Sequence, residues 1–445
     1  MRGVILAAGE GSRLRAYSDR PKPLIPLLGL SLIERNILAL KECGINEILI
    51  ITGCYDAEIR DYLGSGRRLG VSIEYLHNPQ WKLGNGVSAH TFQQAYRENE
   101  KYILLMADHV FAVDLLRAFI KEAEKLEQDR LLLAADNRLD QVYDVAECTK
   151  IMAEGGPQAK RLGKGLKDFN AVDCGLFADS GLLQKALAQS IDRGAYALTD
   201  AVNLLAAEGK VNLHYVNHYW VDVDDPAAYQ HCERVLLRSL VPPKDGFISR
   251  TVNRKFSLRI TRQLAATKIT PNQMTVISFL VAAASAASFA FLNPLIGGLL
   301  AQLSSILDGV DGEIARLKFL QSSYGEMFDS ILDRYADYLI VLGMAFAWYS
   351  STHQTTAAML VSAAALTGLP LSMLFKEKYR KLTGKAYVPE INDGRLHYLP
   401  ANRDGRLFII MLGGIFNQIP AALILLAAVT HLQCLFRLRA VRRVL

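Results

Sequence analysis

The sequence predicts two structural classes in one chain: an α/β domain followed by an all-α domain of six transmembrane helices. Up to residue 238, short β-branched or leucine-rich runs alternate with amphipathic helical stretches, which is typical of an α/β domain with a largely parallel sheet. From Thr270 onward the apolar runs are long enough to cross a bilayer. Hydrophobic residues make up 51% of the chain and charged residues 21%, which fits a soluble part joined to a membrane part.

The α/β part is expected to carry its functional residues at one edge of the sheet. Strands are predicted at residues 3–7, 47–52, 73–76, 102–106 and 131–134. Helices are predicted at residues 32–42, 57–63, 87–96 and 113–126. Because ligands of such sheets bind at the carboxyl ends of the strands, the segments that follow the strands are the candidates for a site.

The turn after the first predicted strand is rich in glycine and basic residues and reads LAAGEGSRLRAYSDRPKPLIPL. Gly9 and Gly11 free the backbone to surround phosphates with N–H groups. Arg13 and Lys22 supply positive charge to a triphosphate and to its departing pyrophosphate. The turn resembles the signature loop of the sugar nucleotidyltransferases, L-A-A-G-x-G-[ST]-R-L followed by P-K, with Ser12 in place of the more frequent threonine.

That resemblance implies an α/β nucleotidyltransferase (Rossmann-like) fold in which the two basic residues of the turn act in catalysis. The residues that would bind the nucleotide are Leu6, Ala7, Ala8, Gly9, Gly11, Lys22, Asn85 and Gly86. Asp108 and Asp222 match the two metal ligands of the family. Lys164 and Asp173 fall near the expected contacts to the acceptor phosphate and hydroxyl. A solvated loop side chain is the alternative for any one of them, and for Lys164 the two readings are equal.

The membrane part holds four acids within residues 308–333, DGVDGEIARLKFLQSSYGEMFDSILD. Asp308 and Asp311 are three residues apart, and Asp329 and Asp333 are four apart, so on helices each pair lies on one face. Carboxylates converging from two helices would make an oxygen-rich site for a hard divalent cation, Mg²⁺ or Mn²⁺, which in turn could hold a pyrophosphate. Helix-surface acids that face water are the alternative, although acids within a membrane are costly and usually functional.

The same stretch matches, without a gap, the D-x2-D-G-x2-A-R-x8-G-x3-D-x3-D signature of the CDP-alcohol phosphotransferases. The matching residues are Asp308, Asp311, Gly312, Ala315, Arg316, Gly325, Asp329 and Asp333. The resemblance implies an integral membrane enzyme that transfers a phosphoalcohol from a CDP-alcohol to a second hydroxyl and releases CMP. It also implies a homodimer formed through the membrane helices.

The resemblance further implies a division of roles within this stretch. The metal ligands would be Asp308, Asp311, Asp329 and Asp333. Gly312 and Arg316 would accommodate the cytidine diphosphate. We expect Asp333 to be the general base as well, because it lies one helical turn after Asp329 and reaches further toward the acceptor.

Six apolar spans follow Thr270, and the basic residues between them alternate sides. The predicted spans are residues 271–292, 294–317, 324–349, 355–375, 406–416 and 420–436. The turns at 291–297, 349–356 and 414–421 contain no lysine or arginine, whereas the intervening segments do. The positive-inside rule then predicts a multi-pass cell-membrane protein with both termini and both sites on the cytoplasmic face.

The segment 239–246 (SLVPPKDG) is the predicted linker, because its prolines mark a shift in composition. After it, apolar residues recur every four positions with basic residues between them. This pattern predicts a basic amphipathic helix on the cytoplasmic membrane surface; an ordinary surface helix of the first domain is the alternative. The predicted domains are therefore 1–238, 239–269 and 270–445.

The last long basic segment, residues 376–406, contains two further candidates. Arg403 and Arg406 would anchor an acceptor that carries a phosphate. The positive-inside rule by itself explains these arginines equally well. The sequence leaves both readings open.

A chain with both signatures in this order resembles the archaeal and bacterial bifunctional enzymes of inositol-phosphate metabolism. That resemblance implies CTP and inositol 1-phosphate as substrates, CDP-inositol as the intermediate, and phosphorylated di-inositol phosphate as the product. One alternative is a phospholipid synthase with a lipid alcohol as acceptor and a regulatory or differently specific first domain. The other is an ion transporter, which would leave the turn from Gly11 to Lys22 unexplained. We expect no nucleic-acid partner.

Overall fold

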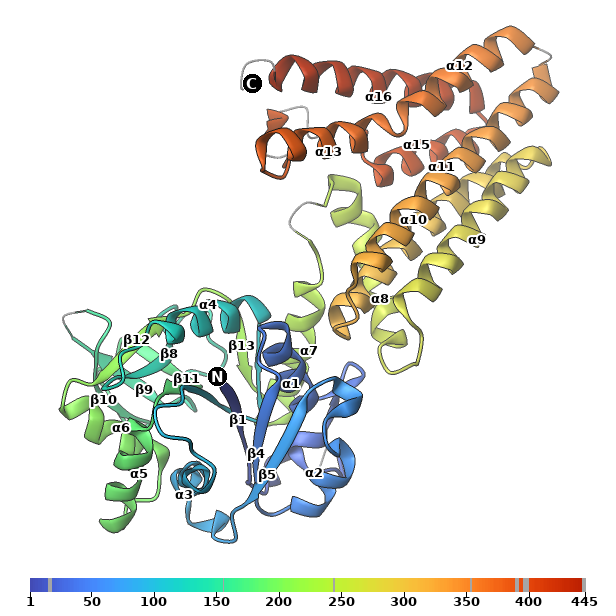
Figure 1. The fold of residues 1–445 in the computed structure, drawn as a ribbon. Helices are drawn as coiled ribbons and strands as arrows, with labels where there is room; N and C mark the ends of the chain where they lie inside the picture. The colour runs from blue at the N-terminus through green and yellow to red at the C-terminus, as the bar shows by residue number, and fades with distance from the viewer. Residues whose placement is uncertain are drawn as a thin grey trace. The chain divides into compact units, whose positions relative to one another are not determined.

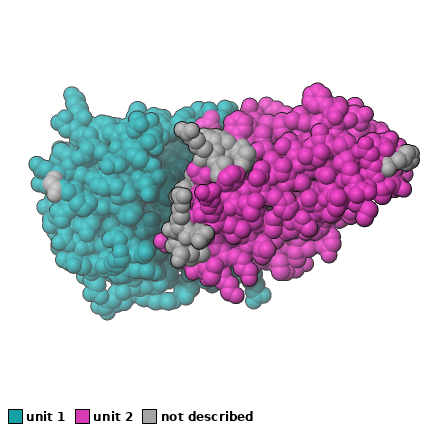
Figure 2. Space-filling view, turned by 90° about the horizontal axis from the view of Figure 1, so that it is seen from above, with its two compact units in different colours: residues 1–235 teal, residues 236–445 magenta. Residues whose placement is uncertain are grey.

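The computed structural model of the chain describes residues 1–14, 18–154, 156–242, 245–352, 354–388, 392–394 and 400–441. These residues form two compact units, Met1–Val235 and Leu236–Leu445, which are coloured separately in Figure 2. The first is an α/β unit and the second is helical (Figure 1). The two units are described in turn.

A nine-stranded sheet lies at the centre of the first unit. Its strands are β1 (Arg2–Ala7), β4 (Glu47–Thr52), β5 (Ser72–His77), β6 (Tyr102–Met106), β8 (Leu131–Asp136), β9 (Lys150–Ala153), β10 (Ala159–Gly163), β11 (Ala171–Asp179) and β12 (Val211–Tyr215). Strands β5, β4, β1 and β6 run parallel, but β11 is antiparallel to β6, β8 and β9. The prediction of a largely parallel sheet is therefore wrong, because β11 joins the parallel strands to an antiparallel region and makes the sheet mixed.

Among its described residues the first unit also has two short sheets, several 3-10 turns and seven α-helices, the last of which continues past Val235. The short sheets pair β2 (Pro26–Leu27) with β3 (Leu30–Ser31) and β7 (His109–Phe111) with β13 (Trp220–Asp222). The helices are α1 (Leu32–Glu42), α2 (Asp56–Leu63), α3 (Asn85–Thr91), α4 (Val113–Glu124), α5 (Leu182–Asp192), α6 (Leu198–Ala207) and α7 (Pro226–Ser239). The predicted strands and helices are all present, although α3 ends early, at Thr91.

The central sheet is covered on both faces. Every residue of β1 is buried, and Val4 and Leu6 share one core with Leu183 of α5 and Val202 of α6. Helices α3, α5 and α6 pack with one another, and α1 packs with α4 (Figure 1). A strand that is buried on both faces has a continuous apolar sequence. The apolar runs of β1 and β8 therefore predicted strands at these positions.

The second unit is built of helices. They are a π-helical turn (Ser249–Asn253), α8 (Arg254–Leu264), α9 (Pro271–Ala290), α10 (Pro294–Leu317), α11 (Ser323–Thr352), α12 (Thr355–Gly368), α13 (Leu371–Thr383), α15 (Arg403–Ile415) and α16 (Ile419–Val441). Helix α10 packs against α8, α9 and α15, and α11 packs against α9, α12 and α16. Helices α10 and α15 approach closely, since a Cβ at Gly298 would lie 2.8 Å from Met411 O.

Local signals define where the first membrane helix begins. Thr270 Oγ1 accepts a hydrogen bond from the Gln273 N–H at 3.3 Å, and the Gln273 side chain accepts one from the Thr270 N–H at 3.0 Å. Pro271 occupies the first helical position, where its missing N–H costs nothing. This capping box explains the sharp change at Thr270.

The predicted spans all lie on helices, but two of them differ from the prediction. The fourth is divided around Pro370, which cannot donate a helical hydrogen bond, and the fifth already begins at Arg403. Three helical stretches are long and apolar enough to cross a membrane: Pro271–Ala290, Thr355–Thr383 and Ile419–Val441. Within the described residues α10 and α11, which carry the four acids, do not meet that criterion, so the count of six membrane helices stays a prediction.

Helix α11 offers a direct test of the predicted orientation. It has 30 residues, about 45 Å at 1.5 Å per residue, so its ends can lie on opposite sides of a hydrocarbon core of about 30 Å. In a background whose six native cysteines are changed to alanine, we expect Thr352→Cys to react with an impermeant thiol reagent from outside, and Ser322→Cys to react only after permeabilisation. Labelling of both positions from the same side would contradict the six-span topology.

Candidate functional site

The loop after β1 is shaped by one glycine. Gly11 has a left-handed backbone with φ of 63°, and a Cβ at this position would collide with the Lys22 side chain. The Leu14 N–H donates to Gly11 O at 3.3 Å, so the chain turns at once into the short 3-10 helix Ser12–Leu14. Glycine at position 11 therefore lets this loop lie against the turn that contains Lys22.

The pairing of β7 with β13 brings three possible metal ligands together in the first unit. His109 pairs with Asp222 across the two strands, and Asp108 precedes β7. His109 Nδ1 lies 2.9 Å from Asp108 Oδ1 and 3.7 Å from Asp222 Oδ1. One ligand atom from each residue lies within 4.8 Å of the others. Asp222 Oδ1 is buried and has no hydrogen-bond partner among the described residues, which fits a cation site.

Lys22 lies between two carboxylates of the same cluster. Its Nζ donates to Asp108 Oδ2 at 2.6 Å and also to Asp224. Arg13 is 59% exposed and lies 3.4 Å from Asp224 Oδ2 and 3.7 Å from Glu147 Oε2. Lys22 thus pairs with Asp108 and Asp224, and Arg13 lies near Asp224 and Glu147 at the solvent-exposed side of the cluster.

These charges shift one another's pKa. Burial disfavours the charged form of Lys22, but Asp108, Asp224 and Asp222 raise its pKa above the ordinary value. Burial would raise the pKa of Asp108, yet Lys22 and His109 hold it below its usual range. Burial likewise opposes the charge on His109, while Asp222 and Asp108 raise its pKa to about 9. A cation bound through His109 would therefore have to displace a proton.

The cluster opens into a cavity of about 350 Å³, within the size range of ligand sites. Predicted residues that line it are Leu6, Ala8, Gly9, Asn85, Asp108, Lys164, Asp173 and Asp222. Burial raises the pKa of Asp173 to about 6, and the Gly175 N–H donates to its carboxylate at 2.7 Å. Lys164 is 63% exposed and lies 3.8 Å from Glu147. Ala7 is buried in β1 beside the cavity loop.

Asn85 and Gly86 hold the beginning of α3 against the beginning of α6. Asn85 Oδ1 accepts a hydrogen bond from the Leu198 N–H at 2.9 Å. The Gly86 N–H donates to Tyr196 O at 2.9 Å, and a Cβ at residue 86 would lie 2.6 Å from that oxygen. Only glycine fits this contact, so the wall of the cavity near Asn85 depends on it.

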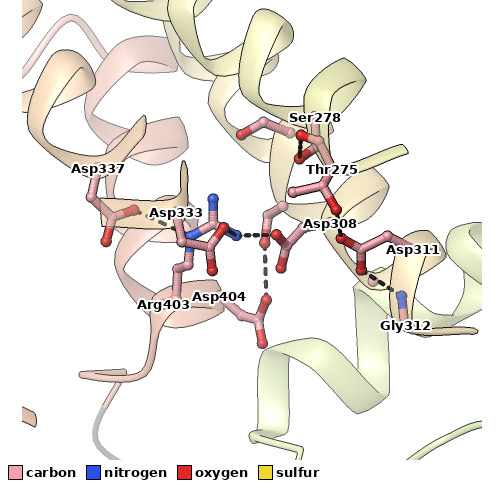
Figure 3. Close-up of polar contacts among 12 residues, drawn as sticks. Thr275, Ser278, Asp308, Asp311, Gly312, Asp333, Asp337, Arg403 and Asp404 are labelled. Atoms are coloured by element: carbon pink, nitrogen blue, oxygen red, sulfur yellow. Dashed lines mark hydrogen bonds and ion pairs between the residues drawn. The ribbon is translucent and has the colours of Figure 1, made fainter. Parts of the chain in front are cut away.

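In the second unit, α10 and α11 bring three acids together. Asp308, Asp311 and Asp329 each place a carboxylate oxygen within 4.8 Å of the others. Thr275 Oγ1 of α9 donates to Asp311 Oδ2 at 2.6 Å, and the Gly312 N–H donates to the other oxygen (Figure 3). Asp329 Oδ1 is buried and has no hydrogen-bond partner among the described residues. Buried carboxylate oxygens without donors fit a divalent cation.

Asp333 lies beside this group and is paired with an arginine. Arg403 Nη1 is 2.6 Å from Asp308 Oδ1 and 2.9 Å from Asp333 Oδ1, so the guanidinium lies between acids of α10 and α11 (Figure 3). Arg403 Nε also donates to Asp337 Oδ1 at 3.3 Å. One side chain from α15 therefore compensates charge on both helices.

Arg406, the second arginine predicted to anchor the acceptor, is buried and engaged with protein groups. Its Nη2 donates to Asp337 Oδ2 at 2.6 Å and its Nη1 donates to Ala401 O at 2.9 Å. Arg406 and Asp337 are each 3% exposed. Arg403 thus contacts two acids of the motif, Asp308 and Asp333. Arg406 instead contacts Asp337, which lies outside the motif.

The predicted donor-binding residues line a second cavity, of about 610 Å³. Its lining includes Thr275, Asp311, Gly312, Arg316, Gly325 and Asp329. Arg316 Nε and Nη2 donate to Leu240 O at 3.1 and 2.8 Å. A Cβ at Gly312 would lie 3.2 Å from Arg316 Nη1, so glycine leaves room for the guanidinium at the cavity wall.

Four residues that the sequence analysis did not select belong to these clusters. Asp224 lies two residues after Asp222, and His109 directly follows Asp108, so proximity to a predicted ligand was their only signal. Asp337 continues the four-residue spacing of Asp329 and Asp333 along α11. No pattern in the sequence marked Thr275, because its contact to α10 is tertiary.

Two family models match the chain: the nucleotidyl transferase family at residues 2–238 and the CDP-alcohol phosphatidyltransferase family at residues 268–433. Relatives match nearly the whole chain. A Thermococcus kodakarensis protein named "Bifunctional IPC transferase and DIPP synthase" is 33% identical over 439 residues, covering 97% of this chain and 95% of the relative. The chain belongs to this family.

Two further members of the IPC transferase and DIPP synthase family support the assignment. The protein of that name from Archaeoglobus fulgidus is 35% identical and covers 93% of this chain and 78% of its own length. The one from Rubrobacter xylanophilus is 33% identical and covers 99% and 96%. The chain is thus a bifunctional transferase of the membrane, with a nucleotidyltransferase fold followed by a helical region that contains three apolar spans.

Proposed function

We propose that the chain makes CDP-inositol from CTP and inositol 1-phosphate, and then transfers inositol phosphate from it to a second inositol 1-phosphate. The products are phosphorylated di-inositol phosphate and CMP. The observation that carries this proposal is the presence, in one chain, of a lysine–aspartate cluster at a cavity and a carboxylate cluster on α10 and α11. We assign the two reactions to residues 1–238 and 270–445, with 239–269 between them.

In the first reaction, a phosphate oxygen of inositol 1-phosphate attacks the α-phosphorus of CTP, and the bond to the β-phosphate breaks to release pyrophosphate. Arg13 and Lys22 neutralise charge on the phosphates. The backbone of residues 6–11 and the beginning of α3 at Asn85 and Gly86 bind the nucleotide, as the place of Leu6, Ala8, Gly9 and Asn85 at the cavity supports. Lys164 and Asp173, which also line this cavity, contact the acceptor.

In the second reaction, the acceptor hydroxyl attacks the β-phosphorus of CDP-inositol and CMP leaves. Asp333 accepts the proton of that hydroxyl. Gly312 and Arg316 hold the cytidine diphosphate in the cavity that they line. Arg403 contacts Asp308 and Asp333 of the site and is therefore a better candidate for the acceptor phosphate than Arg406, whose contacts are to Asp337 and Ala401.

Both reactions handle phosphate charge, and the two acid clusters fit divalent cations. Asp308, Asp311, Asp329 and Asp333 would hold them in the second unit, and Asp108 and Asp222 in the first. Bound Mg²⁺ (or Mn²⁺) would screen the phosphate groups and stabilise the leaving group. We further propose a homodimer formed through the membrane helices, with both termini and both sites on the cytoplasmic face.

The direct test is product analysis of the purified full-length protein. Given CTP, Mg²⁺ and inositol 1-phosphate, it is expected to release pyrophosphate and CMP and to form a phosphorylated di-inositol phosphate. A panel of other phosphorylated polyols and a lipid alcohol serves as the comparison. Turnover of CTP with another polyol phosphate only, or of CDP-inositol with the lipid alcohol only, would refute the proposed substrates.

Lys22→Ala separates the two reactions. Loss of the ammonium group leaves the phosphates unneutralised and Asp108 without its partner, so CDP-inositol formation should fall by about 100-fold or more. Transfer from supplied CDP-inositol should persist, because it takes place in the other unit. Lys121→Ala, at an exposed position on α4, is the control. Pyrophosphate release at the wild-type rate in Lys22→Ala would contradict the assignment.

Asp333→Asn separates proton transfer from metal binding in the second unit. The substitution keeps the shape but removes the base, so the transfer rate should fall about 10²–10⁴-fold, while binding of CDP-inositol is nearly unchanged. Asp308→Asn or Asp311→Asn should weaken metal and CDP-inositol binding together. A metal titration of nucleotide binding, beside single-turnover rates, makes the comparison. If Asp333→Asn weakens nucleotide binding as much as the other two substitutions and added metal restores its rate, Asp333 acts as a ligand only and the base lies elsewhere.

A further inference from the structure

The segment between the two family-matched regions belongs to the second unit by its contacts. Residues 239–267 lie outside both matched ranges, 2–238 and 268–433, yet the second unit begins at Leu236. Helix α8 lies beside α10 (Figure 1). A segment whose prolines and charges suggest a tether is therefore packed on the helix that carries Asp308 and Asp311.

The main contact is a fully buried carboxylate. Glu313 follows Gly312 directly and is 0% exposed. Its Oε1 accepts hydrogen bonds from Arg254 Nη1 at 2.5 Å and Ser257 Oγ at 2.6 Å. Its Oε2 accepts one from Thr261 Oγ1 at 2.5 Å. Residues 254, 257 and 261 lie on one face of α8, so both oxygens of Glu313 are satisfied by that single helix.

Arg254 is itself held in place from two sides. Its Nε donates to Asp245 Oδ2 at 2.7 Å, and its Nη1 donates to Gly309 O of α10 at 3.2 Å. The planar guanidinium thereby joins the linker, α8 and α10 with fixed geometry, which a lysine ammonium cannot reproduce. Asp245 and Arg254 are each 12% exposed, so this network is shielded from solvent.

A second, separate contact holds the same turn of α10. The carbonyl oxygen of Leu240 accepts hydrogen bonds from Arg316 Nε and Nη2. The third nitrogen, Nη1, is directed to Gly312, at the wall of the 610 Å³ cavity. Glu313 and Arg316 are thus both bound by residues of the segment before α9, and they lie in the turn of α10 that lines the donor cavity.

We propose that residues 240–242 and 245–261 are a positioning element of the phosphotransferase site, in which Arg254 and Glu313 fix the turn of α10 that carries Gly312 and Arg316. The inference rests on the proposed function, since it takes the ligand of that cavity to be a CDP-alcohol. A buried ion pair is a poor source of stability compared with apolar packing, whereas it fixes the orientation of a helix. Misplacement of a binding group by about 1 Å can cost about 100-fold in rate.

The test uses the full-length chain with the double substitution Arg254→Gln and Glu313→Gln. Substituting Glu313 together with Arg254 leaves no unpaired charge at the fully buried position 313; Asp245, which is 12% exposed, loses the hydrogen bond from Arg254 Nε. The half-saturating concentration of CDP-inositol should rise about tenfold or more, the Mg²⁺-dependent affinity for CDP should fall in parallel, and the maximal rate should change far less. Formation of CDP-inositol by the first unit should stay at the wild-type rate and serves as the internal control.

Two single substitutions sharpen the result. Arg254→Lys keeps the charge but not the planar fork, so its half-saturating concentration should lie between those of the wild type and the double variant. Arg259→Gln, on an exposed position of α8, should behave as wild type. A matching increase for Arg259→Gln would overturn the inference, because any loss of charge on α8 would then suffice.

Two outcomes overturn the inference and leave the proposed function intact. One is wild-type half-saturation and CDP affinity in the double variant, which would make the segment a tether only. The other is a parallel loss of both activities, which would indicate general destabilisation. In contrast, a wild-type protein that transfers nothing from CDP-inositol defeats the proposed function, and the CDP-binding measurement then still decides whether the segment positions the cavity.

Discussion

Repulsion among partly buried carboxylates is the constraint on which both candidate sites depend. Two like charges a few ångströms apart in a poorly solvated place raise the free energy steeply unless cations lie between them. In the first unit Lys22 lies between Asp108 and Asp224. In the second, Arg403 lies between Asp308 and Asp333. Each unit thus brings acids together beside a cavity, and each balances part of their charge with its own basic side chains.

Charge balance extends beyond the residues that face the cavities. Asp337 is surrounded by Arg334, Arg403 and Arg406, and its carboxylate is nearly fully buried. Glu313 is balanced by Arg254 in the same way. A buried pair of this kind is destabilising as soon as one member is removed. The helices α8 and α10 are therefore joined by the buried pair of Arg254 and Glu313, and α11 and α15 by the buried pair of Asp337 and Arg406.

The two units reach a similar electrostatic arrangement with different elements. The first uses the ends of strands, where β7 and β13 pair and place His109 opposite Asp222. The second uses helix faces, where three- and four-residue spacings stack carboxylates along α10 and α11. Such convergence is expected when both reactions move phosphoryl or nucleotidyl groups, because catalysis of these reactions is largely positioning and charge stabilisation.

Much of this was determined by local sequence. Buried strands are apolar throughout, and amphipathic helices repeat their apolar residues every three or four positions. The spacings of the acids in residues 308–333 place each pair on one face of a helix. These features depend on neighbours in the chain and were therefore predictable. Contacts between distant segments were decided by the tertiary structure alone. Strand β11 pairs antiparallel with β6 and makes the sheet mixed. Arg403 contacts Asp308 and Asp333, and Arg406 donates a hydrogen bond to Asp337. The sequence predicted a linker from its change in composition, but it did not predict the hydrogen bonds that this segment makes to Glu313 and Arg316. Hydrogen bonds between residues dozens of positions apart leave no periodic signal, because their partners are brought together only by the packing of whole helices.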